Sequence, residues 1–273
     1  CIRDRLHTVG RRIRVDSVLT DVGAQARHRL RRRFAVADDP RAHPLERIPA
    51  PPEDAVLVHY SGRPGQVVAV DAAAVVRLAR RKGCRIILMI RTGDAVSVGS
   101  RIALVGGGTV SDRQVSRCLL TSAERSLTHD PLYALRILTD VSLRALSPGI
   151  NDPSTAVRSL DEVEGVLRTA APLPVGPVEV KAGRGSVVFR SPTWSDIVDL
   201  ALLEVVDAGL GQLQVTRRLT ALLNDLLADL PEQRHRALLR YKRRLTEGIH
   251  EHLQGEYRSI ALTGDRQGIG GSR

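Results

Sequence analysis

Apolar residues recur every three or four positions over the first 34 residues, which is the spacing of one helix face. These positions are Leu6, Val9, Ile13, Val18, Val22, Ala26 and Leu30. The pattern predicts an amphipathic helix or a pair of helices. Residues 35–53 are rich in proline and predict an irregular linker, so the first expected segment is 1–53.

The period changes to that of β-strands between residues 54 and 110. The stretches 56–58, 67–70 and 85–90 predict strands, and 72–81 predicts a short helix between the last two. Residues 93–104 follow the pattern G-D-x-V-x-x-G-x-x-x-x-L, which resembles the turn that closes barrel-sandwich modules such as biotinyl and lipoyl domains. The modified lysine and its flanking motif are absent, so we expect no biotin, no lipoate and no other cofactor.

Residues 111–256 are expected to be mainly helical. The apolar periodicity predicts helices over roughly 113–125, 131–146, 153–169, 193–208, 211–229 and 231–252, with a β-hairpin near 178–190. Residues 257–273 are expected to be a disordered tail. The fold class predicted from these patterns is α+β: a small barrel-sandwich-like β module followed by a mainly helical domain with one β-hairpin.

The turn between helices 131–146 and 153–169 holds the most specific local pattern. Pro148-Gly149 ends the first helix, and Asp152 stands at the N-cap of the second, with Pro153 at its first position. Free backbone N–H groups and nearby arginines would suit an anion or a lipid headgroup. The hypothetical site consists of Arg144, Ser147, Asn151, Asp152, Ser154, Thr155 and Arg158. The alternative is a plain helix–loop–helix joint.

A polar stripe leads along helix 131–146 to this turn. Its supporting members are Arg125, Asp130, Arg136 and Asp140. Residues three or four apart lie on one helix face, so the stripe could order the site, although a salt-bridge ladder is the commoner role of such a pattern.

Catalytic signatures are weak by comparison. No serine lies in a G-x-S-x-G context, and His250 and His252 are two residues apart, which suits neither one helix face nor a metal pair. We therefore assign no catalytic residue and no metal ligand. The enzymatic alternative is a hydrolase or transferase that acts on a phosphate-bearing substrate at the Asp152 turn.

Charge and cysteine content limit the partners. The chain has 41 Lys and Arg residues against 30 Asp and Glu, a formal charge of +11, and only three of the basic residues are lysines. Such an arginine excess could reflect phosphate binding or codon usage. Basic residues are scattered and aromatics few, so no specific nucleic acid is expected. The ten arginines within 1–34 would suit an anionic lipid surface, or the solvated face of a connecting helix. The three cysteines show no paired spacing, which fits a reducing compartment.

Residues 124–156 carry a family resemblance. Glu124-Arg125, Asp130-Pro131 and the run Ser147-Pro148-Gly149-Ile150-Asn151-Asp152-Pro153-Ser154-Thr155-Ala156 resemble the hallmark region of domain-of-unknown-function family 2254, a family of predicted bacterial membrane proteins. The resemblance extends over nearly the whole chain. Two positions depart from it: Arg125-Ser126 replaces the usual Arg-Thr, and Gly62-Arg63-Pro64 replaces Gly-Tyr-Val. The family offers no catalytic residues to carry over.

The resemblance implies an N-terminal block of transmembrane helices followed by a soluble region. This chain begins at Cys1 and has no apolar run of about 18 residues, so it looks like that soluble region without the membrane block. We expect a cytoplasmic regulatory or assembly region of a channel-like or transporter-like protein of the cell membrane. It is expected to form a homo-oligomer and to sense an anionic ligand.

Overall fold

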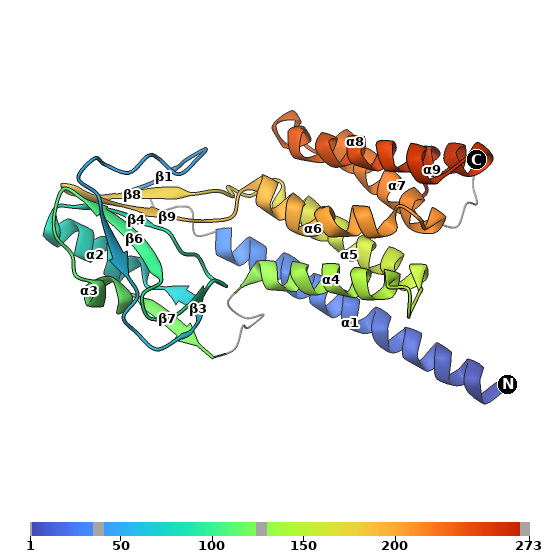
Figure 1. Ribbon diagram of the computed structural model, residues 1–273, viewed down its shortest axis with the longest axis horizontal. Coiled ribbons are helices and arrows are strands. Elements are labelled where there is room, and N and C mark those ends of the chain that lie inside the picture. The colour runs from blue at the N-terminus through green and yellow to red at the C-terminus, as the bar shows by residue number, and fades with distance from the viewer. Residues whose placement is uncertain (1, 35–40, 124–129, 268–273) are drawn as a thin grey trace. The chain divides into compact units, whose positions relative to one another are not determined.

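The computed structural model describes residues 2–34, 41–123 and 130–267, which divide into two compact units (Figure 1). The helical unit comprises Cys1–Arg31, Ala134–Pro172 and Trp194–Arg273. The β unit comprises Arg32–Tyr133 and Leu173–Thr193. Both units are therefore assembled from segments that are far apart in the sequence.

The β unit contains two sheets, and neither is a closed barrel. The six-stranded sheet has the order β1-β8-β9-β4-β6-β2, in which β4 and β9 are parallel and all other neighbours antiparallel. The three-stranded sheet has the order β5-β3-β7. The strands are β1 (Ala42–Pro44), β2 (Val56–His59), β3 (Gly65–Val70), β4 (Arg85–Leu88), β5 (Ala95–Val96), β6 (Arg101–Gly106), β7 (Leu119–Ser122), β8 (Val178–Ala182) and β9 (Gly185–Phe189). The α+β fold class predicted from the sequence is confirmed.

The predicted hairpin near 178–190 exists as β8–β9, but it does not belong to the helical unit, where the sequence analysis placed it. Its second strand pairs with β4, with Arg85 opposite Ser186. Val187 and Val188 of β9 are fully buried. A strand that is buried in this way needs neighbours on both edges, and β4 supplies one of them. The pairing joins residues about 100 positions apart, which local periodicity does not reveal.

The prediction of a single helix over 113–125 is wrong. The structure has a short helix α3 (Asp112–Ser116) followed by β7, which pairs antiparallel with β3. The strand is favoured over a continued helix because it places Leu119 in the core of the β unit, where this residue is 8% exposed. The first part of the predicted disordered tail at 257–273 differs as well, since helix α9 (Gly255–Thr263) occupies it and buries Ala261, while residues 268–273 lie outside the described part of the chain.

Helix α2 (Ala72–Lys82) covers part of the six-stranded sheet next to the β8–β9 hairpin. The Asp71 side chain caps it by accepting a hydrogen bond from the Ala74 N–H at 2.9 Å. Gly83 ends it in the left-handed conformation with φ of 62°. Val75, Leu78 and Ala79 form its buried face. The predicted helix over 72–81 is thus confirmed.

The helical unit is built from α1 and α4–α9. Their bounds are α1 (Ile2–Phe34), α4 (Pro131–Leu146), α5 (Pro153–Ala170), α6 (Trp194–Gly209), α7 (Leu213–Asp229) and α8 (His235–His252), followed by α9. Helix α5 is central. It contributes buried side chains to the core, and its acidic side chains pair with arginines of α1 and α7. Among the described residues, no helix has an apolar stretch of the length and hydropathy needed to span a bilayer.

Helix α1 is one continuous helix rather than a pair. Leu19, Val22, Ala26 and Leu30 form one face and are all at most 8% exposed. Val18, which the sequence pattern placed on the same face, is 52% exposed. The apolar face of the second half of α1 is therefore part of the core of the helical unit.

Candidate functional site

The turn between α4 and α5 is a tightly bonded joint. The Asn151 N–H donates to the Ser147 carbonyl at 2.8 Å, and the Asp152 N–H donates to the Ala145 carbonyl at 2.8 Å. The Ser147 hydroxyl donates to the Arg144 carbonyl at 2.7 Å. The structure thus brings the predicted residues together, and it uses most of their hydrogen-bonding groups within the joint itself.

Asp152 is the N-cap of α5, as the sequence predicted. Its carboxylate accepts hydrogen bonds from the Thr155 N–H at 3.2 Å and from the Thr155 hydroxyl at 2.7 Å. The carboxylate therefore occupies the position at the helix N-terminus where an external anion would bind. The exposed Ser154 lies beside it in the first turn.

Asn151 has a backbone φ of 47°, in the left-handed region that asparagine tolerates better than most residues. Its side-chain oxygen accepts a hydrogen bond from Gln212 Nε2 at 3.0 Å, which ties the joint to the residue that precedes α7. Asn151 therefore has a local structural role in making the turn.

The two arginines of the hypothetical anion site differ. Arg158 Nη1 is 3.3 Å from an Asp161 oxygen, and its other nitrogens reach Thr20 at 3.4 Å and Asp16 at 3.9 Å on α1. Arg144 is exposed and forms no salt bridge with any residue in the described part of the chain. Anion binding at this joint stays a prediction, and the carboxylates around Arg158 weaken the case for it.

The supporting stripe is divided. Arg136 forms ion pairs with Asp140, at 2.8 Å, and with Glu204 of α6. Burial lowers the pKa of Arg136, but the hydrogen bonds to Glu204 and Asp140 outweigh it, so the pKa lies above the ordinary value. Asp130 is 5% exposed and accepts the Leu132 N–H at 3.0 Å, while Arg125 lies outside the described residues. In the described part, the stripe acts as a salt-bridge ladder that joins α4 to α6.

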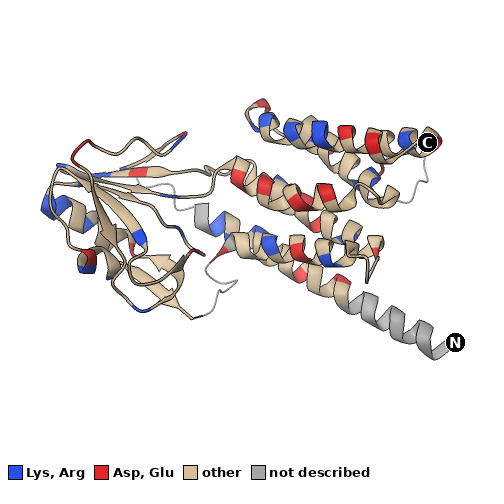
Figure 2. Ribbon diagram, in the orientation of Figure 1, with Lys and Arg blue, Asp and Glu red and all other residues tan. Residues whose placement is uncertain are grey.

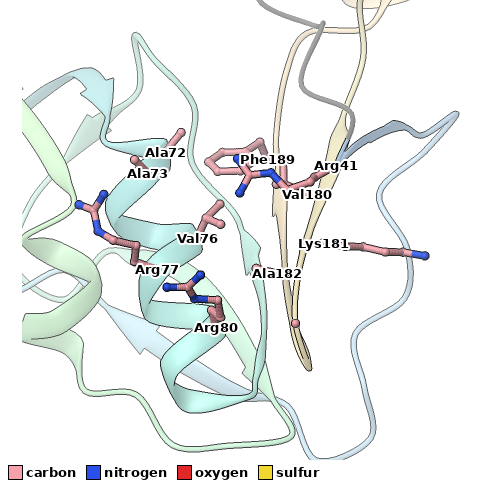
Figure 3. A pocket seen from close by; sticks show the side chains of 11 residues that line it. Arg41, Ala72, Ala73, Val76, Arg77, Arg80, Val180, Lys181, Ala182 and Phe189 are labelled. Carbon is pink, nitrogen blue, oxygen red and sulfur yellow. The ribbon is translucent and has the colours of Figure 1, made fainter.

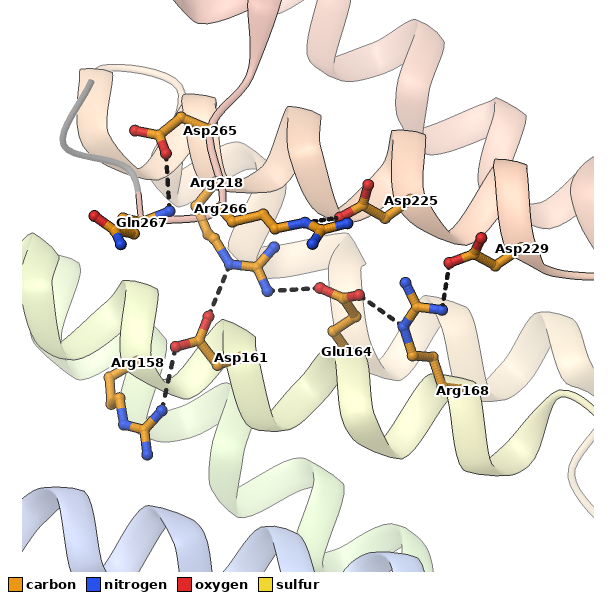
Figure 4. A network of polar contacts seen from close by, with 10 residues as sticks. All are labelled: Arg158, Asp161, Glu164, Arg168, Arg218, Asp225, Asp229, Asp265, Arg266 and Gln267. Carbon is orange, nitrogen blue, oxygen red and sulfur yellow. Dashed lines mark hydrogen bonds and ion pairs between the residues drawn. The ribbon is translucent and has the colours of Figure 1, made fainter. Parts of the chain in front are cut away.

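A charge network between α5 and α7 was missed by the sequence analysis (Figure 4). The side chain of Arg218 is 4% exposed and donates to Asp161 at 2.8 Å and to Glu164 at 2.6 Å. Arg168 extends the network from Glu164 to Asp229, at 2.8 Å each. The i, i+4 spacing of Glu164 and Arg168 was visible in the sequence, but the partner on α7 was not.

A cavity of about 600 Å³ lies within the β unit, between α2 and the β8–β9 hairpin, and was also missed (Figure 3). Its lining residues are Arg41, Ala72, Ala73, Val76, Arg77, Arg80, Val180, Lys181, Ala182, Gly183 and Phe189. None of the residues of the α4–α5 joint lines it. The cationic members come from three separate stretches of sequence, so spacing could not have grouped them.

The surroundings of the two described cysteines lower the reactivity of their thiols. Cys84 and Cys118 are buried and free. Burial raises the pKa of both thiols, and nearby Asp71 raises that of Cys118 further. A thiol with a raised pKa is mostly protonated at neutral pH and is a poor nucleophile or metal ligand. Among the described residues, no group of three His, Cys, Asp or Glu side chains could hold a metal ion.

Comparisons with known proteins identify relatives but no activity. The family model described as predicted membrane protein (DUF2254) matches residues 6–225. Uncharacterized proteins of Mycobacterium bovis and Mycobacterium tuberculosis are each 30% identical over 200 residues, which is 68% of this chain and 37% of theirs. The chain thus matches little more than a third of the length of these relatives. No solved structure matches it significantly. The extent of the family match shows that the chain belongs to the DUF2254 family of predicted membrane proteins.

Proposed function

We propose that this chain is a cytoplasmic regulatory or assembly region of an integral membrane protein, and that α1 links it to the membrane part. The observation that carries the proposal is the packing of α1 on α5. The family membership supports the membrane context, and the greater length of the mycobacterial relatives leaves room for a membrane part in proteins of this kind.

The contact between α1 and α5 combines apolar packing with a half-buried ion pair. Arg27 Nη1 lies 2.7 Å from Glu162 Oε2, and the Glu162 side chain is only 10% exposed. Gly23 on α1 leaves room for this carboxylate, because a Cβ at that position would clash with it. A shift of α1 would therefore act on α5 directly, because a buried carboxylate that loses its partner is costly.

The length of α1 suits a linking role. Its 33 residues extend for about 50 Å at 1.5 Å per residue. Within it, the face formed by Leu19, Val22, Ala26 and Leu30 packs on the helical unit. The arginines of α1 favour the cytoplasmic side, where positively charged residues next to membrane spans accumulate.

Sidedness can be tested by cysteine labelling of the full-length protein in intact cells. In a background with Cys1→Ser, Leu239→Cys on α8 introduces a thiol at a position that is 51% exposed. A membrane-impermeant maleimide should label it only after the cells are opened. Ala237→Cys, at a position that is 9% exposed, is the matched control and should react only after denaturation. Labelling of Leu239→Cys in intact cells would contradict the cytoplasmic assignment.

The assembly role can be tested on the full-length protein in detergent by light scattering and amide hydrogen exchange. Glu162→Ala should speed exchange in α1 and shift the protein towards smaller oligomers, because Arg27 loses its partner. Glu247→Ala on α8 removes only an exposed 3.8 Å pair and should change neither. A monomeric parent protein, or an oligomer that does not respond to Glu162→Ala, would count against an assembly role.

A further inference from the structure

The cavity between α2 and the β8–β9 hairpin has the size of a small-molecule site. Its volume of about 600 Å³ lies within the range of roughly 300–1,000 Å³ that is usual for ligand pockets. At about 30 Å³ per water molecule, it would hold on the order of twenty waters. A single inorganic anion would therefore leave most of the cavity to water.

The charged residues that line the cavity all carry the same sign. Four of its eleven lining residues are Arg or Lys, and none is Asp or Glu. Within residues 2–34, 41–123 and 130–267, Arg77, Arg80 and Lys181 form no salt bridge. These three cations have no carboxylate partner in those ranges, and like charges that lie near one space repel each other unless an anion neutralises them. The electrostatics of the cavity thus favour a ligand with more than one negative charge.

The cationic side chains approach the cavity from different elements (Figure 3). The Cγ of Arg80 on α2 lies next to the hairpin turn at Gly183, and Arg41, which directly precedes β1, extends towards the ring of Phe189. Lys181 points away from α2, and Arg77 leaves α2 on the side away from the hairpin. Arg41 and Arg80 are therefore placed to contact a bound anion, while Arg77 and Lys181 add to the positive potential at the rim.

The remaining lining is mostly apolar. Val76 of α2 faces Val180 and Phe189 of the hairpin, and all three are partly exposed at the cavity. An aromatic ring next to guanidinium groups offers a stacking surface to a flat ligand. This combination of apolar surface and cationic groups fits a ligand with an anionic end and a flat or apolar body.

The walls of the cavity are held by backbone contacts, so the site exists before any ligand binds. Gly185 at the start of β9 sits so close to α2 that a Cβ there would clash with the carbonyl oxygens of Ala79 and Cys84. The Arg80 side chain lies over the hairpin turn, with its Cγ 3.6 Å from where a Cβ of Gly183 would be. A preformed site costs a ligand less ordering entropy on binding.

We propose that this cavity binds an organic phosphate, with the phosphate oxygens held by the guanidinium groups of Arg41 and Arg80 and the flat or apolar body against Phe189, Val76 and Val180. The planar guanidinium fork matches phosphate geometry and gives strong, charge-assisted hydrogen bonds. A nucleoside diphosphate has the required charge, size and flat base. A phosphorylated lipid headgroup presents the same phosphate chemistry and is the other source.

Binding at this cavity has a consequence for the rest of the chain. The β8–β9 hairpin is joined to helices of the helical unit on both sides, to α5 before it and to α6 after it. A ligand held between α2 and the hairpin would fix the hairpin on α2 and constrain both of these connections. The binding site stands on its own contacts, and only this regulatory consequence rests on the proposed function.

The experiment is isothermal titration calorimetry of the whole chain with ADP as the probe, at low and physiological salt. Parent protein should bind ADP saturably, and adenosine and inorganic phosphate should each bind at least about tenfold more weakly, because each makes only part of the contacts. Binding should weaken as salt rises. Absence of saturable binding of ADP, together with absence of binding to the vesicles described below, would overturn the proposal.

Two variants with the same charge change locate the site. Arg80→Glu should lower the affinity for ADP by about tenfold or more, because it removes a phosphate contact and adds a repulsive carboxylate. Arg101→Glu, an exposed position on β6 outside the cavity, should lower it less than about threefold. Phe189→Leu should weaken ADP more than inorganic phosphate. Equal effects of Arg80→Glu and Arg101→Glu would show a diffuse charge effect and overturn the proposal.

A vesicle-binding experiment distinguishes the two sources of phosphate, a soluble nucleotide and a lipid headgroup. The chain is sedimented with phosphatidylcholine vesicles with and without 5% phosphatidylinositol 4-phosphate. Cosedimentation that needs the phosphoinositide, is lost in Arg80→Glu and is retained in Arg101→Glu would identify a lipid headgroup as the source. ADP binding without such cosedimentation would identify a soluble nucleotide. Cosedimentation that is unchanged in Arg80→Glu would show binding elsewhere on the surface and contradict a headgroup at the cavity.

Discussion

Two regions of this molecule use arginine in opposite ways. Between α5 and α7, Arg218 and Arg168 are matched by the carboxylates of Asp161, Glu164 and Asp229, with contacts of 2.6–2.8 Å. Around the cavity of the β unit, the lining includes cations and no carboxylate. The first arrangement pairs its charges within the fold, whereas three cations of the second, Arg77, Arg80 and Lys181, form no salt bridge within the described ranges.

The pairing of charges continues through the helical unit. All four charged residues of α6 are acidic, namely Asp196, Asp199, Glu204 and Asp207, and basic residues of α4 and α8 contact three of them (Figure 2). The formal charge of +11 therefore does not show which basic residues are available to a ligand. What decides whether an arginine is structural or available to a ligand is the presence of a carboxylate within reach.

The largest expected effect comes from breaking the internal network at Arg218. Arg218→Ala leaves Asp161 and Glu164 without their partner on α7 and should lower the free energy of unfolding by about 3 kcal/mol. Urea denaturation followed by circular dichroism measures it. Arg266→Ala removes a pair with Asp225 on the surface, where Arg266 is 77% exposed, and should cost less than about 1 kcal/mol. Equal costs would show that burial does not distinguish the two pairs.

Breaking the scaffold of the cavity should have the next largest effect. Gly185→Ala places a methyl group against two backbone carbonyls and should destabilise the β unit by about 2 kcal/mol. Gly149→Ala in the α4–α5 joint is the control, because nothing lies within 4 Å of the new methyl group, and it should stay within about 0.5 kcal/mol of the parent. Chemical denaturation of both variants gives the comparison. A harmless Gly185→Ala would show that the hairpin is not closely held on α2.

The α4–α5 joint should respond to loss of its cap. Asp152→Ala removes the acceptor for the Thr155 N–H and should cost about 1 kcal/mol in a urea titration, while Asp152→Asn should keep most of the stability. If the joint were an anion site, Asp152→Asn would also raise its affinity for phosphate by removing a negative charge. Unchanged phosphate binding in Asp152→Asn is the result expected here.

A smaller effect concerns alkaline pH. Burial, together with the hydrogen bond that the Tyr241 hydroxyl donates to Asp199 at 2.9 Å, raises the pKa of Tyr241 to about 12 from its ordinary value of 10.0. Because the folded state holds this proton more tightly, its contribution to stability is complete below pH 10 and is lost as the pH rises to 12. Tyr241→Phe should flatten this decline in denaturation measured from pH 9 to 12. Tyr257→Phe, at a position that is 63% exposed, should not.

The smallest expected change in stability belongs to the cavity rim. Arg80 is exposed and has no salt bridge to a residue of the described ranges, so Arg80→Glu should shift the free energy of unfolding by less than about 0.5 kcal/mol. Thermal and urea denaturation check this. A large loss of stability would mean that Arg80 holds the hairpin in place and is not available to a ligand.

The sequence predicted most features that depend on neighbouring residues. The cap at Asp152, the helix over 72–81 and the β8–β9 hairpin are all signalled within a few positions of the chain. It could not show which sheet the hairpin joins, because β4 lies about 100 residues away. The prediction of a helix over 113–125 was wrong for a related reason, since the pairing of β7 with β3 outweighed the local helical periodicity.

The candidate sites follow the same rule. The Asp152 joint could be found because its residues are consecutive, but its internal hydrogen bonds were invisible. The cavity could not be found, because Arg41, Arg80 and Lys181 lie in three separate segments. Local sequence patterns thus pointed to residues that form a structural turn. Only folding brings together the basic residues that line the cavity, where no carboxylate is among the lining residues.

The most direct test of this contrast is the affinity for ADP of three proteins measured side by side by calorimetry: the parent, Arg80→Glu and Arg158→Glu. Both variants make the same change of charge, one at the cavity and one at the α4–α5 joint. This contrast predicts that Arg80→Glu loses about tenfold or more in affinity, whereas Arg158→Glu, once shown to be folded by circular dichroism, stays within about threefold of the parent. Loss of binding in Arg158→Glu with retention in Arg80→Glu would contradict it and place the anion site at the Asp152 joint.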